Sequence, residues 1–170
     1  MSPCAFFDRD GTLMEEVGFC SDPAEVRLIP GAREGLLRLR QAGFRIVVVT
    51  NQSGIGRGIF TEAHYRLVEH EFLRQIGPEL IDATYYCPDA PDVTPSRRKP
   101  SPDMLLDAAR DLGLDLTRSF MTGDRAGDIE AGHRAGCRSI LVLTGYGTES
   151  ATADYIAPTV VEACDWILSQ

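Results

Sequence analysis

The chain has 170 residues, 44% of them hydrophobic, which predicts a single domain over residues 1–170 with a core of its own. The net charge of −8 and the dispersed Lys and Arg residues leave no basic face, which argues against a nucleic-acid-binding protein. The cysteines are odd in number and form no C-x-x-C pair, which argues against a disulfide-rich protein. The sequence has no apolar stretch long enough to span a membrane and no signal-peptide pattern. We therefore expect a cytoplasmic protein.

Short apolar runs alternate with helical patterns along the chain, and this alternation predicts an α/β fold. We expect a doubly wound, Rossmann-like parallel sheet with helices on both faces. In chain order the predicted elements are a strand at 4–7, a helix at 32–41, a strand at 45–50, a helix at 62–76, a strand at 83–86, a helix at 102–113, a strand at 119–122, a helix from about 128 to 136, a strand at 138–143 and a last helix.

Polar cap residues mark where several helices begin. The predicted caps are Thr61, Ser101 with Pro102, and Thr159 with Glu162 as a capping box. Residues 89–98 are rich in proline and charge and predict an irregular loop, while three glycines between residues 54 and 58 indicate a mobile loop. No gap between these elements holds a further fold, so we expect no large cap domain.

Polar segments follow the first four predicted strands, at the end where ligands bind in open parallel sheets. These segments are Asp8-Arg9-Asp10-Gly11-Thr12, Thr50-Asn51, Arg98-Lys99, and Gly123-Asp124 with Asp128. Each is ambiguous alone, because acidic residues often cap turns or helices, a strand-end threonine is often structural and most lysines lie on the surface. Together they predict one cluster of carboxylates, a hydroxyl and a cation.

Two carboxylates one residue apart, as in Asp8 and Asp10, repel each other unless a cation lies between them or one side chain turns away. Mg²⁺ favours carboxylate and phosphate oxygens, and Asp8 with Asp124 could anchor it. The alternative is a turn in which the acidic groups only satisfy backbone N–H groups. An EF-hand calcium loop does not fit, because it needs glycine at loop position six and glutamate at position twelve.

The other segments offer groups for phosphate. Thr50 and Asn51 end an apolar strand, so a hydroxyl and free backbone N–H groups could hold phosphoryl oxygens there. Lys99 could reach both a nucleophilic carboxylate and the transferred phosphoryl group. Asp128 lies on the same face as Asp124 if the turn between them is helical.

These segments resemble the motifs of the haloacid dehalogenase superfamily of phosphohydrolases, and the likeness covers nearly the whole chain. The stretches 50–58 and 98–100 are similar to the branch that contains heptose 1,7-bisphosphate phosphatases and histidinol phosphatases. The resemblance implies a magnesium-dependent phosphatase that forms an aspartyl-phosphate. It implies that Asp8 is the nucleophile, that Asp10 is the acid and then the base, that Thr50 contacts phosphate and that Lys99 balances charge. The implied magnesium ligands are Asp8, Asp124 and the Asp10 carbonyl, and Asp128 would support either the magnesium ligands or the Lys99 side chain.

Substrate recognition is expected from three loops, near residues 14–28, 53–60 and 87–98, since no cap domain covers the site. Arginines in these loops favour a small phosphorylated metabolite, in particular a sugar bisphosphate. The expected substrate-binding residues are Asn51, Arg57 and Arg98, with Arg97 as a further candidate. Histidinol phosphate is the alternative substrate, and a receiver-type or non-catalytic phosphate-binding module is a remote alternative.

One departure from the branch concerns zinc. Its members commonly carry a loop of Cys-x-His followed by Cys-x-Cys just before the Arg-Lys-Pro segment. Here Cys87 is retained, but Asp89, Pro95 and Arg97 stand at the other three positions. A structural zinc site needs four thiolate or imidazole ligands, so we expect no zinc in this protein.

Overall fold

The chain winds around a parallel sheet whose strand order is β3-β2-β1-β4-β5-β6. A computed structural model describes residues 1–147 and 152–170. The strands are β1 (Cys4–Phe7), β2 (Arg45–Asn51), β3 (Ala83–Cys87), β4 (Phe120–Gly123), β5 (Arg138–Val142) and β6 (Tyr155–Ala157). This order confirms the doubly wound α/β fold predicted from the sequence.

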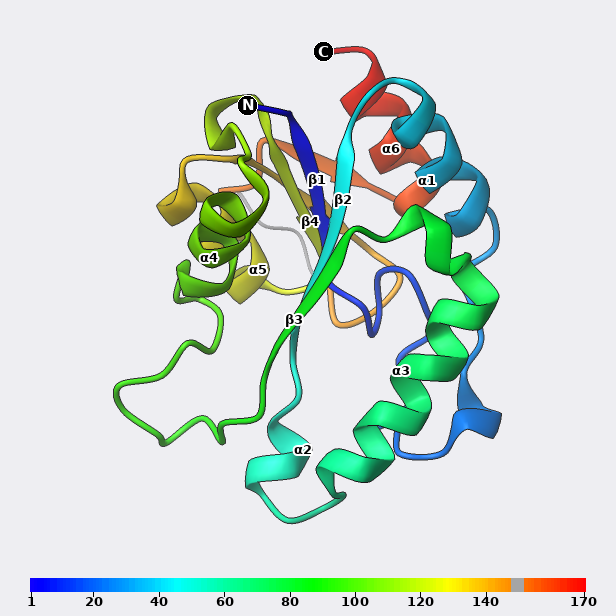
Figure 1. Cartoon of the computed structure of the whole chain (residues 1–170), viewed down its shortest axis with the longest axis vertical. Coiled ribbons are helices and arrows are strands. Elements are labelled where there is room, and N and C mark those ends of the chain that lie inside the picture. Colours follow the sequence, from blue (N-terminus) through cyan, green and yellow to red (C-terminus); the bar gives the residue numbers. More distant parts are fainter. Residues whose placement is uncertain (148–151) are drawn as a thin grey trace.

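Helices cover both faces of the sheet. They are α1 (Ala32–Gln41), α2 (Ser53–Gly56), α3 (Glu62–Ile76), α4 (Asp103–Leu112), α5 (Ala126–Ala135) and α6 (Val160–Leu168), with short 3-10 turns at Pro23–Glu25, Pro78–Leu80 and Leu116–Arg118. Figure 1 shows α1, α3 and α6 on one side of the strands and α4 and α5 on the other. The connection from β1 to β2 and the connection from β2 to β3 contain no further domain among the described residues, as expected for a chain without a large cap.

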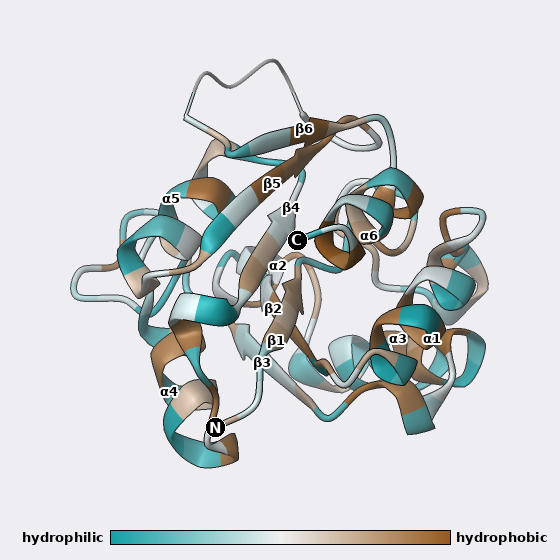
Figure 2. Ribbon diagram, turned by 90° about the horizontal axis from the view of Figure 1, so that it is seen from above, coloured by the Kyte–Doolittle hydropathy of each residue, from teal (hydrophilic) through white to brown (hydrophobic). Residues whose placement is uncertain are grey.

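Alternate strand residues enter two separate cores, because successive side chains of a strand point to opposite faces. Phe7 and Val48 pack in the core under α1, α3 and α6, whereas Phe6 and Val49 pack in the core under α4 and α5. All four side chains are fully buried. The apolar strands lie between the two helical layers in Figure 2, which explains why β1 and β2 have continuous hydrophobic runs.

The sheet order places the ends of β1 and β4 side by side. The connections from these two strands lead to opposite halves of the sheet, so a crevice opens beyond their carboxyl ends. Asp8 follows β1 and Asp124 follows β4. The Asp8 N–H donates to the Thr122 carbonyl at 2.9 Å, which extends the β1–β4 pairing up to the first residue of the predicted site.

Some local expectations need correction. Pro102 is the N-cap residue of α4, which begins at Asp103, because the Ser101 hydroxyl accepts the Asp103 N–H at 3.3 Å and so forms a turn before the helix. The helix expected near Asp128 begins at Ala126, and the Asp128 carboxylate accepts the Arg125 N–H at 3.0 Å. The stretch expected as a mobile loop contains the helical turn α2.

Other local expectations are confirmed. The Thr61 hydroxyl accepts the His64 N–H, and Thr159 with Glu162 forms the capping box that begins α6. The five cysteines are free and buried. Within residues 1–147 and 152–170, no helix is both long and apolar enough to cross a membrane.

The strand β6 was not predicted, because three residues are too few to give a hydrophobic period.

Close packing of α5 on the sheet gives a test of the fold. A Cβ atom at Gly132 would lie 2.2 Å from Ser139 Oγ and 2.6 Å from Met121 Cβ. We therefore expect Gly132→Ala to lower the free energy of unfolding by about 1–3 kcal/mol, the usual cost of overpacking. Urea denaturation should show this loss, while Glu130→Ala on the exposed face of the same helix should change stability little. Equal stability of Gly132→Ala and the wild type would contradict the described packing.

Candidate active site

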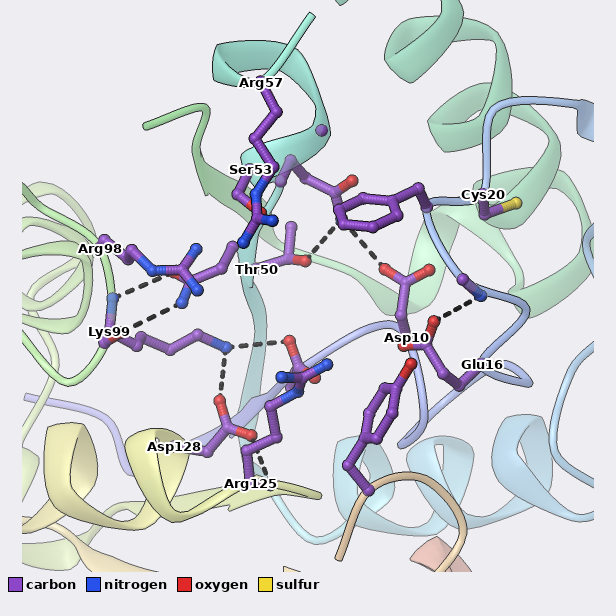
Figure 3. A pocket seen from close by; sticks show the side chains of 17 residues that line it. Asp10, Glu16, Cys20, Thr50, Ser53, Arg57, Arg98, Lys99, Arg125 and Asp128 are labelled. Atoms are coloured by element: carbon purple, nitrogen blue, oxygen red, sulfur yellow. Dashed lines mark hydrogen bonds and ion pairs between the residues drawn. The ribbon is translucent and has the colours of Figure 1, made fainter. Parts of the chain in front are cut away.

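The predicted site residues come together in one pocket at the carboxyl ends of the strands (Figure 3). The lining includes Asp8, Asp10, Thr50, Asn51, Arg57, Arg98, Lys99 and Asp128. Asp124 is fully buried, and carboxylate oxygens of Asp8, Asp124 and Asp128 lie within 4.8 Å of one another. The strand-end argument therefore found residues that are far apart in the sequence but adjacent in space.

Lys99 is the centre of the buried charge cluster. Its ammonium donates to Asp8 Oδ1 at 2.9 Å and to the Val49 carbonyl at 2.7 Å, and it forms an ion pair with Asp128 Oδ1 at 2.6 Å. These three partners use all three N–H donors of the ammonium. Burial alone would lower the pKa of Lys99, but Asp128 and Asp8 outweigh this effect and hold the pKa above its ordinary value. Lys99 is therefore a fixed positive charge.

Asp8 is a buried carboxyl group among like charges. Burial raises its pKa well above the ordinary value. The charge of Lys99 opposes this rise, whereas Asp128 and Asp124 add to it. A cation bound beside Asp8 would favour the ionised form, which is the form that can act as a nucleophile.

Asp124 has an oxygen available for such a cation. Its Oδ2 accepts the Tyr146 N–H at 2.8 Å, whereas its Oδ1 is buried and has no hydrogen-bond partner among the described residues. Burial and the charge of Asp128 raise its pKa. An unpaired buried carboxylate oxygen beside another carboxylate fits a hard divalent cation such as Mg²⁺.

Asp128 has a different place in the cluster. One of its oxygens pairs with Lys99 and the other accepts the Arg125 N–H. Both oxygens are thus occupied within the protein, so Asp128 suits a supporting role. Asp8 and Asp124 are the carboxylates that could hold a metal ion.

Two glycines let the backbone approach Asp124 closely. A Cβ atom at Gly11 would lie 2.4 Å from Asp124 Oδ2, and one at Gly145 would lie 2.1 Å from the same oxygen. Gly11 also has a φ angle of +84°, which side-chain-bearing residues rarely adopt. These positions explain why the Asp-x-Asp-Gly segment and the turn after β5 both need glycine.

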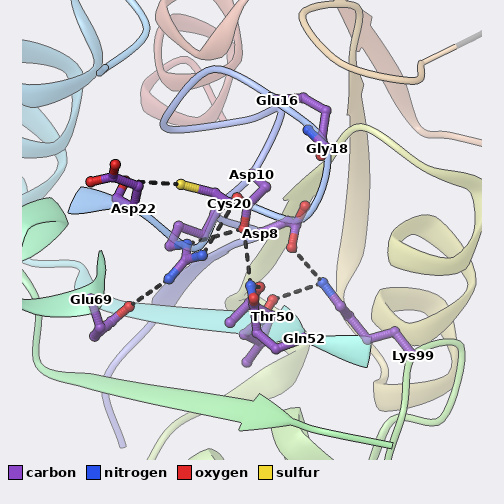
Figure 4. Close-up of polar contacts among 12 residues, drawn as sticks. Asp8, Asp10, Glu16, Gly18, Cys20, Asp22, Thr50, Gln52, Glu69 and Lys99 are labelled. Carbon is purple, nitrogen blue, oxygen red and sulfur yellow. Dashed lines mark hydrogen bonds and ion pairs between the residues drawn. The ribbon is translucent and has the colours of Figure 1, made fainter. Parts of the chain in front are cut away.

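Asp10 is oriented by two neighbours (Figure 4). Arg9 Nε and Gln52 Nε2 each donate to Asp10 Oδ2 at 3.0 Å. Gln52 Nε2 also donates to Thr50 Oγ1 at 2.9 Å, which leaves the threonine hydroxyl hydrogen available for a phosphoryl oxygen. Gln52 was not predicted as a site residue. Its spacing of two residues from Thr50 was the available signal, because residues two apart lie on the same face of an extended segment.

Arg9 ties this segment to helix α3. The Arg9 guanidinium is fully buried, and its Nη1 donates to Glu69 Oε2 at 3.1 Å. Burial would lower the pKa of Arg9, but the carboxylates of Asp10 and Glu69 raise it above its ordinary value. The pairing could not be read from the sequence, because Glu69 stands 60 residues away.

Asn51 lines the pocket, but its side-chain amide is engaged within the protein. Its Nδ2 donates to the Lys99 carbonyl at 3.1 Å, and its Oδ1 accepts the Lys99 N–H at 3.0 Å. The pair fixes the backbone from which the Lys99 side chain extends. Contact between Asn51 and substrate stays a prediction.

Three arginines extend toward the same central space of the pocket (Figure 3). Arg57 lies over the Phe19 ring at 5.5 Å and Arg125 over the Tyr146 ring at 4.0 Å. Arg98 Nη1 is buried without a hydrogen-bond partner in the described part of the chain. Burial lowers the pKa of Arg98, and the charges of Arg57 and Arg125 lower it further.

Two corrections concern this group. Arg97, the further candidate, is not among the residues that line the pocket and forms an ion pair with Asp107 on α4. Arg125 was missed, although its place between Asp124 and Asp128 was a sequence signal that could have revealed it. All three loops expected near the substrate do contribute lining residues, for example Phe19, Ser53 and Arg98.

Comparisons with known proteins agree with this geometry. A sequence model described as HAD-hydrolase-like matches residues 96–163. A D-glycero-D-manno-heptose-1,7-bisphosphate 7-phosphatase of Thermosynechococcus vestitus is 37% identical, with 97% of this chain and 95% of that protein covered. The D-glycero-beta-D-manno-heptose-1,7-bisphosphate 7-phosphatase of Escherichia coli K12 is 34% identical, with 98% and 88% covered.

A similar solved structure is that of D,D-heptose 1,7-bisphosphate phosphatase from B. bronchiseptica, complexed with magnesium and phosphate. It superposes with a TM-score of 0.88 at 30% identity, and 98% of each chain is covered. These relatives extend over nearly the full length of the chain, and they are named phosphatases. The protein therefore belongs to the haloacid dehalogenase-like hydrolases, as a phosphatase of the heptose 1,7-bisphosphate phosphatase branch.

Proposed function

We propose that this protein is a magnesium-dependent D-glycero-D-manno-heptose 1,7-bisphosphate 7-phosphatase that forms an aspartyl-phosphate on Asp8. The observation that carries the proposal is an excess of positive charge in the pocket of Asp8. Three arginines, Arg57, Arg98 and Arg125, line this pocket together with Lys99 and Thr50. These cations exceed what one phosphate group needs, and a substrate with two phosphate groups matches them.

In the first step a carboxylate oxygen of Asp8 attacks phosphorus, and the bond from phosphorus to the sugar oxygen breaks. Asp10 gives its proton to the departing oxygen, which leaves as a sugar hydroxyl. In the second step Asp10 takes a proton from water, whose oxygen attacks the phosphorus of the aspartyl-phosphate. Inorganic phosphate leaves and the Asp8 carboxylate is restored.

Fixed groups of the protein prepare these steps. Gln52 and Arg9 hold Asp10 at the pocket, and Lys99 offers a positive charge beside Asp8. The Thr50 hydroxyl can donate to a phosphoryl oxygen. Asp8, Asp124 and the Asp10 carbonyl would hold magnesium, which when bound offsets negative charge on the phosphoryl oxygens.

The arginines favour a bisphosphate over the alternative substrate. Histidinol phosphate carries an ammonium group on its organic part, which three nearby guanidinium groups would repel. In the described part of the chain, none of Arg57, Arg98 and Arg125 forms an ion pair with a carboxylate, so their charges are available to a ligand. A second phosphate would satisfy them through charge-assisted hydrogen bonds.

The first prediction from the proposed function concerns the nucleophile. Asp8→Asn removes the attacking carboxylate but keeps the side-chain volume, so kcat should fall by several orders of magnitude. The variant should remain folded, because Lys99 keeps Asp128 and the Val49 carbonyl as partners. Steady-state phosphate release and circular dichroism measure both effects, with Asp92→Asn in an exposed loop as the control. Turnover near the wild-type rate in Asp8→Asn would contradict the proposed intermediate.

The second prediction concerns the metal. EDTA should stop turnover and added magnesium should restore it, since the carboxylates of Asp8 and Asp124 need a counter-charge. Magnesium should also raise the melting temperature of the wild type. In Asp124→Asn the magnesium concentration for half-maximal stabilisation should rise by at least the roughly 10- to 100-fold that is typical of a lost outer-shell partner. Full activity in excess EDTA would exclude this role for magnesium.

The third prediction concerns Arg98. Arg98→Ala should lower kcat/KM for the heptose bisphosphate about tenfold to a hundredfold more than kcat/KM for p-nitrophenyl phosphate, because a charge-assisted contact is worth about 1.5–3 kcal/mol. The matched control is Arg97→Ala, whose side chain pairs with Asp107 on α4. Equal losses on both substrates in Arg98→Ala would place Arg98 with the reacting groups instead.

A further inference from the structure

The loop from Pro88 to Arg98 leads into two adjacent site residues, Arg98 and Lys99. It leaves the edge strand β3, runs without regular structure and returns with Arg98 and Lys99 before α4 (Figure 1). The Arg98 side chain reaches the pocket from the end of this loop. An irregular loop of this length needs internal contacts to present one side chain in one place.

Ser96 provides those contacts. Its hydroxyl donates to Asp89 Oδ2 at 2.7 Å and accepts the Arg98 N–H at 3.0 Å. The Cys87 sulfur lies 3.6 Å from the same oxygen. Since the single hydroxyl proton is given to Asp89, the Cys87 thiol is the donor in this third contact. One hydroxyl thus joins the first residues of the loop to its last.

The two backbone polar groups of Arg98 are both engaged. Its N–H donates to Ser96 Oγ, and its carbonyl accepts the Ser101 N–H at 2.9 Å. The next residue, Lys99, is held by the Asn51 side chain. The backbone of Arg98 is therefore fixed on both sides, while its guanidinium is left without an ion-pair partner among the described residues.

The same contacts bear on zinc. Cys87 and Asp89 stand at two of the four positions where the branch carries zinc ligands, and Ser96 lies between the other two, Pro95 and Arg97. These four positions do not fit a four-ligand zinc site. They offer one thiol, one carboxylate, a proline and an arginine that is paired with Asp107. The Ser96 hydroxyl instead joins Cys87 and Asp89, the residues at the first two of these positions.

This loop also touches the loop that carries Arg57. The Gly56 N–H donates to the Pro88 carbonyl at 2.9 Å, and a Cβ atom at Gly56 would lie 2.6 Å from that oxygen. The Gln52 N–H donates to the Cys87 carbonyl at 2.8 Å. We call the group of hydrogen bonds that Ser96 makes with Cys87, Asp89 and Arg98 the clasp. Through these backbone contacts the clasp is connected to the segments that carry Arg57 and Arg98.

We propose that Ser96 is a positioning residue for substrate selection, because its hydroxyl closes a metal-free clasp with Cys87 and Asp89 that holds Arg98 toward the second phosphate. Ser96 is not among the residues that line the pocket, so it acts through Arg98. The role in selection rests on the proposed function, whereas the clasp itself can be tested without any substrate.

The experiment is a double-mutant cycle of Ser96→Ala and Arg98→Ala. For each protein kcat and KM are measured with the heptose 1,7-bisphosphate and with p-nitrophenyl phosphate. Ser96→Ala should lower kcat/KM for the bisphosphate about three- to tenfold more than for p-nitrophenyl phosphate, mainly through KM. In the Arg98→Ala background the same substitution should add less than about a twofold loss on the bisphosphate. Equal losses in the two backgrounds, or equal losses on the two substrates, would overturn the proposal.

Two matched variants separate the clasp from general damage to the loop. Ser96→Thr keeps the hydroxyl and should restore most of the selectivity. Thr94→Val removes a hydroxyl from an exposed residue of the same loop, which makes no side-chain hydrogen bond to any residue that the structure describes, and should behave as the wild type. Loss of selectivity in Thr94→Val equal to that in Ser96→Ala would refute a specific role for Ser96.

A substrate-independent measurement tests the clasp alone. Amide hydrogen exchange at Arg98 should be several-fold faster in Ser96→Ala than in the wild type, because the acceptor of that N–H is lost. Unchanged exchange would overturn the clasp, as would one equivalent of zinc in the purified wild type. Failure of the proposed function has a different signature, since the wild type itself would then show no preference for the bisphosphate.

Discussion

The buried ammonium of Lys99 is the interaction on which the site depends. It lies between Asp8 and Asp128 and also binds the Val49 carbonyl, so it connects the ends of β1, β2 and α5. Removing one partner of such a buried pair commonly costs about 3–5 kcal/mol, because the remaining charge is left uncompensated. Yet one ammonium cannot balance Asp8, Asp124 and Asp128 together. The remaining negative charge, with the unpaired oxygen of Asp124, makes this end of the sheet suited to a cation.

Reaction and recognition are supported by different parts of the fold. Two groups proposed to react, Asp8 and Thr50, are buried at the ends of β1 and β2, where backbone pairing with neighbouring strands holds them. The arginines proposed for recognition stand outside the strands. Arg57 and Arg125 lie over aromatic rings, and Arg98 has a buried nitrogen without a hydrogen-bond partner among the described residues. Because the protein has a net charge of −8, this local excess of positive charge is what allows an anionic substrate to approach.

The sequence predicted the doubly wound α/β fold and most of the side chains that gather in the pocket, because parallel strands all bring their carboxyl ends to one edge. It could not predict which of two adjacent arginines enters the pocket, since that depends on Asp107 being available to Arg97. The Arg9–Glu69 pair and the contact of Gln52 with Asp10 were also missed, because each depends on a side-chain conformation across distant segments. Helix starts shifted by one or two residues where Ser101 and Asp128 bond to neighbouring N–H groups.

A loop held by a hydroxyl differs physically from one held by zinc. Thiolate and imidazole ligands must lose protons before they bind metal, so a zinc-held loop responds to pH, to chelators and to oxidation of its cysteines. The Ser96 hydroxyl does not ionise in the ordinary pH range, and the one thiol in its clasp is buried. Arg98 should then keep its position when chelators are present. With magnesium bound as proposed, a chelator would act through the cluster of Asp8 and Asp124, which would separate loss of catalysis from loss of substrate recognition.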